Sequence, residues 1–75
     1  MSTPTEAIRD HLMASNELYR RLRAEHAQYA SQLDQLATKG RLTEAEQMEE
    51  VRLKKLKLRV KDQMESLVRQ AQAVH

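Results

Sequence analysis

The sequence predicts an all-α fold: an antiparallel two-helix hairpin of the coiled-coil type. Its 75 residues contain one glycine, one proline and neither Phe nor Trp, and they are rich in good helix formers. Apolar residues recur at steps of three and four on both sides of the glycine. Two capping patterns mark two helix starts, and the connection between the helices is short, which favours antiparallel neighbours.

The first helix is expected over about residues 4–38. Thr3 supplies an N-cap hydroxyl, Pro4 suits the first helical position, and Glu6 places a carboxylate at the third. A heptad seam follows over four repeats, interrupted only by a serine and a histidine. The spacing therefore predicts one continuous helix with the seam Ile8, Leu12, Ser15, Tyr19, Leu22, His26, Tyr29, Leu33 and Leu36.

A turn is expected at residues 39–42, where Gly40 follows Lys39 and suits a left-handed helix C-cap. Thr43 and Glu46 then repeat the capping-box spacing, so the second helix is expected over about 43–73. Its main apolar stripe consists of Leu53, Leu56, Val60, Met64, Leu67, Ala71 and Val74.

Met48, Val51 and Leu58 form a second apolar stripe, because they fall on nearly the opposite side of the second helix. With the turn centred near Gly40, facing positions of the two helices sum to about 82. The register then pairs Leu33 with Met48, Tyr29 with Leu53, His26 with Leu56, Leu22 with Val60, Tyr19 with Met64, Leu12 with Ala71 and Ile8 with Val74.

The chain is expected to form one domain over residues 1–75 and to self-associate. Two helices touch along a single line, and small domains usually need disulfides, a metal or oligomerisation. Disulfides are excluded because the chain has no cysteine. The simplest assembly is a twofold dimer that forms a four-helix bundle, with Leu18, Val51 and Leu58 as added interface.

Enzymatic activity is not expected, and no catalytic, cofactor or metal residue is assigned. No carboxylate occupies the seam of the first helix, and a two-helix unit offers little room for a substrate pocket. No apolar stretch approaches the roughly 18 residues of a membrane span, and the N-terminus lacks the pattern of a signal peptide. A cytoplasmic protein is the expectation.

Six cations in ten residues are the sharpest local feature of the sequence. They border the second apolar stripe as two flanks: Arg52, Lys55 and Arg59 on one side, and Lys54, Lys57 and Lys61 on the other. A polyanion-binding surface would use such cations. A solvated flank whose aliphatic stems cover the apolar stripe is the favoured interpretation, because aromatic stacking residues are missing from the run. A membrane-surface helix ranks third, since Trp and Phe anchors are absent.

His26 sits on the seam beside Glu25 and is a candidate pH switch or metal ligand. A half-buried histidine that is hydrogen-bonded across the hairpin is the favoured interpretation, because no second ligand lies three or four residues along the same face.

Two motifs resemble the YdcH-like family of small uncharacterised bacterial proteins. Glu25-His26 with Leu33-Asp34 forms the first, and the basic and apolar run over 50–62, ending in Lys61-Asp62, forms the second. The resemblance implies a bacterial cytosolic helical hairpin without an established activity. Tyr29 stands where that family more often has an aliphatic residue. The characteristic positions that the resemblance carries over are His26, Leu53, Lys54, Lys55, Lys57, Leu58, Lys61 and Asp62.

The leading hypothesis is a non-enzymatic interaction protein that self-associates and docks an unidentified protein partner through its second helix. The alternative is a nucleic-acid-associated accessory protein that uses the basic run 52–61. The expected interaction surface consists of Met48, Val51, Arg52, Lys54, Lys55, Lys57, Leu58, Arg59 and Lys61.

Overall fold

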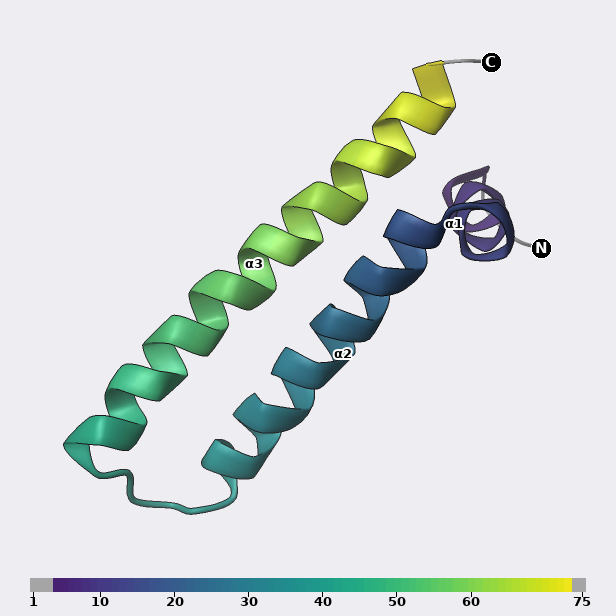
Figure 1. Ribbon diagram of the computed structural model, residues 1–75. Helices are drawn as coiled ribbons and strands as arrows, with labels where there is room; N and C mark the ends of the chain where they lie inside the picture. Colours follow the sequence, from purple (N-terminus) through teal and green to yellow (C-terminus); the bar gives the residue numbers. More distant parts are fainter. Residues whose placement is uncertain (1–3, 74–75) are drawn as a thin grey trace.

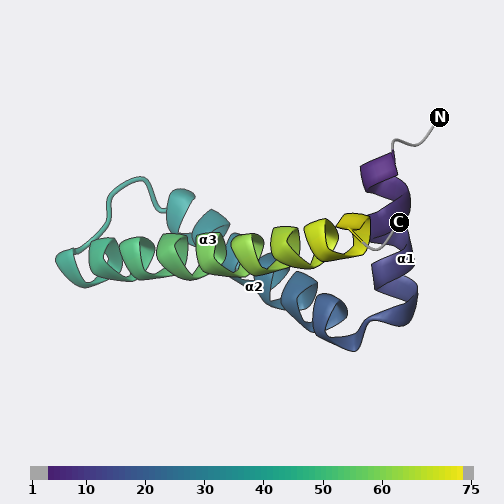
Figure 2. The same cartoon turned by 90° about the horizontal axis from the view of Figure 1, so that it is seen from above.

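Three helices form the part of the chain that the computed structural model describes, residues 4–73: α1 (Pro4–Ser15), α2 (Glu17–Ala37) and α3 (Glu44–Ala73). α2 and α3 run antiparallel as a hairpin, and α1 crosses the end of the hairpin remote from the turn (Figures 1 and 2). The all-α prediction is confirmed. The predicted cap at Thr3 and the stripe position Val74 lie outside the described residues.

The prediction of one continuous helix over 4–38 is wrong, because the chain breaks between Ser15 and Glu17. Asn16 has an extended backbone, with φ −117° and ψ 109°, and its side-chain oxygen accepts a hydrogen bond from the Tyr19 N–H at 2.9 Å. This is the geometry of a helix N-cap, a position at which asparagine is among the most stabilising residues. The break lets α1 fold across the hairpin instead of extending beyond it.

Side chains around the break satisfy carbonyl groups at the end of α1, which would otherwise lack helical partners. The Ser15 hydroxyl donates to the His11 carbonyl at 2.7 Å. The Arg20 guanidinium, from the first turn of α2, donates to the carbonyls of Met13 and Ala14 at 3.2 and 3.3 Å. α1 is therefore tied to α2 by polar contacts at the corner as well as by its apolar face.

The turn and the second helix start agree with the sequence prediction. Gly40 has a φ of 74°, the left-handed conformation that glycine adopts without a steric penalty. At the start of α3 the Thr43 N–H donates to Glu46 Oε1 at 3.0 Å, and the Glu46 N–H donates to Thr43 Oγ1 at 3.1 Å. These two bonds make up a complete capping box. Lys39 also pairs with Glu46 and ties the turn to α3.

One part of the core lies where the three helices meet. Leu12 of α1, Tyr19 of α2 and Val68 of α3 are buried together there. Val68 was not on the predicted stripe of the second helix; α1 crosses the hairpin at this level and widens the buried face of α3. The partly buried residues packed against this cluster are Ile8, Met13, Met64, Leu67 and Ala71.

The rest of the core lies along the hairpin. Leu22 and Leu36 of α2 and Leu53 and Val60 of α3 are buried, and all four are on the predicted seams. The predicted layer that pairs Leu33 with Met48 is wrong, because Met48 is 74% exposed and belongs to the second stripe alone. The hairpin thus buries one line of side chains on each helix.

Candidate functional site

Four large apolar side chains remain exposed among the described residues: Leu18 at 48%, Met48 at 74%, Val51 at 50% and Leu58 at 59%. Three of them lie on α3, where they form the predicted second stripe. The neighbouring helices of the same chain leave this stripe uncovered.

The basic run on α3 is also largely at the surface. Its side chains are exposed except for that of Lys57, which is half-buried. Arg52 forms an ion pair with Glu49. The hydrogen bond between the two side chains lowers the pKa of the Glu49 carboxyl and raises the pKa of the Arg52 guanidinium. Lys54 pairs with Glu50 at 3.6 Å. The acidic start of α3 therefore neutralises the first cations of the run. The later cations form no ion pair within the described residues: Lys55, Lys57, Arg59 and Lys61.

A groove of about 900 Å³ runs between α2 and α3, and only one of the two basic flanks lines it. Lys54, Lys57 and Lys61 line this groove, and Leu58 lies among them. The other flank, Arg52, Lys55 and Arg59, does not line it. The full set of lining residues is Arg9, Tyr19, Arg23, His26, Leu33, Asp34, Ala37, Glu50, Lys54, Lys57, Leu58, Lys61, Met64, Glu65 and Val68.

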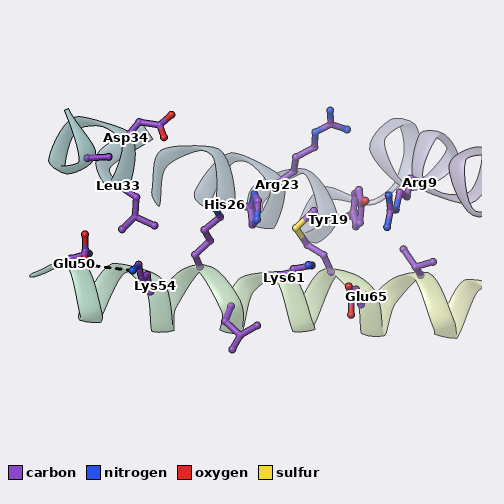
Figure 3. Close-up of a pocket in the computed structure, with 15 residues that line it drawn as sticks. Arg9, Tyr19, Arg23, His26, Leu33, Asp34, Glu50, Lys54, Lys61 and Glu65 are labelled. Carbon is purple, nitrogen blue, oxygen red and sulfur yellow. Dashed lines mark ion pairs between the residues drawn. The ribbon is translucent and has the colours of Figure 1, made fainter. Parts of the chain in front are cut away.

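The groove has an apolar floor and a charged rim. Tyr19 and Val68 close it at the end covered by α1, and Leu33 points from α2 toward α3 (Figure 3). Arg23 and Asp34 also extend from α2, but they point away from α3 (Figure 3). The floor offers apolar contact, while the charged groups stay at the edge and in water.

Cations outnumber acids around the groove, and they are unevenly placed. Asp34 and Glu50 lie at the end near the turn, and Glu65 lies toward the other end. The central length on α3 carries Lys57 and Lys61, neither of which forms an ion pair with a described residue. The middle of the groove is therefore its most basic part.

His26 lines this groove and is half-buried, as the favoured interpretation expected. Its imidazole makes no hydrogen bond to another described residue, so the expected bond across the hairpin is not formed. No group of three His, Asp or Glu side chains between residues 4 and 73 is placed to hold a metal ion. Over the same range, no helix combines the length and the apolar character that crossing a membrane requires.

Sequence reasoning missed part of the groove wall. Arg23 could have been found, because it lies four residues after Tyr19 and three before His26 and so borders the seam of the first helix. Arg9 reaches the groove only because α1 folds back at Asn16, and the heptad pattern gave no signal of that fold.

Comparison with known families gives a match over residues 20–68 to the family described as "Protein of unknown function (DUF465)". The matched segment contains the turn, nearly all of α2 and α3 up to Val68, and it includes every lining residue of the groove except Arg9 and Tyr19. No curated protein and no solved structure matches the chain.

Proposed function

Because the matched segment covers more than half of its 75 residues, the chain belongs to the DUF465 family of proteins of unknown function, and we propose that it is a non-enzymatic interaction module. In this proposal the chain self-associates and docks a protein partner through α3. The observation that carries it is the exposed stripe of Met48, Val51 and Leu58, bordered by basic side chains. The finer resemblance to YdcH-like proteins is part of the same proposal.

The large exposed surface area of the chain supports the proposal that part of its surface binds another protein. The chain exposes 5877 Å², whereas a compact monomer of 8.7 kDa is expected to expose about 4,700 Å². The excess is on the order of 1,000 Å², and a standard protein interface buries about 800 Å² on each partner. The excess is enough for one standard interface.

The nucleic-acid alternative rests on the same cations, and the pattern of ion pairs disfavours it. Arg52 and Lys54 are each held by a carboxylate one helical turn earlier, and apolar side chains interrupt the basic surface. A polyanion contacts cations without needing the apolar stripe between them. A protein partner would use both features.

The test is affinity purification from native lysate with the intact chain and with the double substitution Val51→Ser and Leu58→Ser. Both positions are exposed in the single chain, so the variant is expected to keep its helix content and its three-helix fold. We expect it to lose the specific partner protein. Substitution of Ala27, which is exposed on α2 and small, by serine is the matched control and should keep the partner.

Retention of the same partner by the double variant would exclude the exposed stripe as the docking surface. Recovery of nucleic acid in place of protein, with steep loss between about 50 and 200 mM salt, would favour the alternative.

A further inference from the structure

We propose that the groove between α2 and α3 binds an amphipathic helix with acidic flanks, contributed by a different protein. This inference rests on the proposed function and names the chemistry of the partner. Grooves with an apolar floor commonly take a helix that lays its own apolar face against that floor. The length of the groove, its floor and its charge each constrain the occupant.

The length fits a helix of about five turns. On α3 the lining residues run from Glu50 to Val68, which at 1.5 Å per residue is about 27 Å. An occupant that lies along α3 over this distance has about 18 residues. Such a helix is long enough to present apolar side chains at steps of three and four to the whole floor.

The floor supplies the apolar part of the contact. Leu58 is 59% exposed and lies near the middle of the α3 wall, and the half-buried Leu33 extends from α2 toward α3 near Glu50 and Lys54 (Figure 3). Met64 adds an unbranched side chain that adapts to the shape of a partner. Burial of these groups would contribute most of the affinity, because exposed ion pairs contribute little.

The rim selects the charge of the occupant. Lys57 and Lys61 form no ion pair with a described residue. Carboxylates in the central turns of a partner helix would complement these two lysines. At the end near the turn, Asp34 and Glu50 disfavour further acids, so the acidic residues of the partner belong in its middle.

A second copy of this chain offers no helix with acids clustered in its central turns, because most acids of α3 lie in its first two turns. α2 carries Arg20, Arg21 and Arg23 in its first two turns, so it would bring cations against the lysines of the rim. α3 carries the basic run itself, and the apolar face of α1 is already packed in the core. The occupant is therefore a different protein, and self-association is left to the surface outside the groove.

The probe is a fluorescein-labelled synthetic peptide of about 18 residues. Leucines form one helical stripe, glutamates flank it in the central turns and glutamines fill the rest. One control peptide has the same composition in a scrambled order without a stripe, and another has lysine in place of glutamate. Fluorescence anisotropy should give binding of the first peptide at micromolar concentration and no saturable binding of the two controls.

Matched protein variants locate the peptide on the groove. Lys57→Glu with Lys61→Glu changes the groove wall, whereas Lys55→Glu with Arg59→Glu makes the same charge change at the same spacing on the other flank. We expect the groove variant to weaken binding about tenfold or more and the other to weaken it less than about threefold. The corresponding glutamine pairs, which avoid placing new acids on α3, should rank in the same order.

Equal weakening by the two variant pairs, or equal binding of the scrambled peptide, would overturn the proposal. Displacement of the peptide by a short single-stranded RNA, with both flanks contributing equally to RNA binding, would also overturn it and assign the surface to a polyanion. If the peptide does not bind, while a lysate partner is still lost in the Val51→Ser and Leu58→Ser variant, the proposed function stands and the acidic helix is wrong.

Discussion

At the scale of single residues, Glu46 makes several contacts at the start of α3. Its side chain accepts from the Thr43 N–H to complete the capping box, and it pairs with Lys39 across the turn. The hydrogen bond from Lys39, followed by that from Thr43, lowers the pKa of the Glu46 carboxyl to about 2. One carboxylate thus links the turn to the first turn of α3.

The pKa of Glu46 predicts part of the acid sensitivity of the fold. A carboxyl whose pKa is lower in the folded than in the unfolded state stabilises the fold fully above its unfolded pKa, and this contribution is lost as the pH falls through its folded pKa. The loss should therefore occur between about pH 4.5 and pH 2. Glu46→Gln keeps a side chain that can cap the helix but cannot titrate. It should reduce the change of the free energy of unfolding with pH across this range, which urea unfolding at a series of pH values measures.

The control for this prediction is Glu44→Gln, because Glu44 lies in the same first turn and forms no ion pair within the described residues. It should leave the pH dependence in that range close to that of the unchanged chain. Equal effects of the two substitutions would show that the general charge of the helix start, and not the contacts of Glu46, sets the acid sensitivity.

At the scale of the helices, the sequence predicted the features that depend on residues close to one another in the chain. The capping box at Thr43, the left-handed Gly40 and the seam residues Leu22 and Val60 follow from spacing alone. The break at Asn16 does not, because the heptad pattern passes through it and Ser15 is only a weak interruption. Whether the chain bends there depends on the apolar contacts that α1 gains with α3, and a sequence pattern does not contain those distances.

Asn16→Ala tests whether the cap holds α1 in place. The substitution removes the bond to the Tyr19 N–H and puts the best helix former at the break, so a continuous helix over α1 and α2 becomes more favourable. We expect the free energy of unfolding to fall by about 1 kcal/mol and α1 to leave Val68 more often. Urea unfolding measures the first effect.

The second effect can be measured with spin labels on cysteines introduced at Ala7 and Gln72. Both positions are exposed and neighbour Ile8 and Ala71, which pack against the same cluster, and the chain has no other cysteine. The distance distribution should shift to longer values in Asn16→Ala. Gln28→Ala, within α2, should not shift it. An unchanged distribution in Asn16→Ala would mean that the apolar contacts of α1 alone fix the break.

At the scale of the whole molecule, the described chain is elongated. The extents are 49 × 23 × 18 Å, and the radius of gyration is 15.3 Å, whereas a compact domain of this length would have about 11 Å. Self-association, which was predicted from the length and the missing cysteines, stays a prediction. The sequence did not predict the groove, because the position of α1 at one end of it depends on the break at Asn16, which the heptad pattern did not indicate.

Self-association predicts that thermal stability depends on protein concentration. When unfolding is coupled to dissociation of a dimer, the melting temperature rises with concentration, whereas that of a monomer stays constant. A roughly hundredfold rise in concentration should raise the melting temperature by several degrees, since coupling of this kind adds a few kcal/mol.

Leu18→Ser with Val51→Ser, at two exposed positions outside the groove, should remove this dependence. Leu58→Ser should reduce this dependence less, because Leu58 lines the groove, which we propose binds the acidic helix of another protein and not a second copy. A concentration-independent melting temperature in the unchanged chain would leave the exposed stripe to a protein partner alone, since the cooperative unit would then be the single three-helix chain.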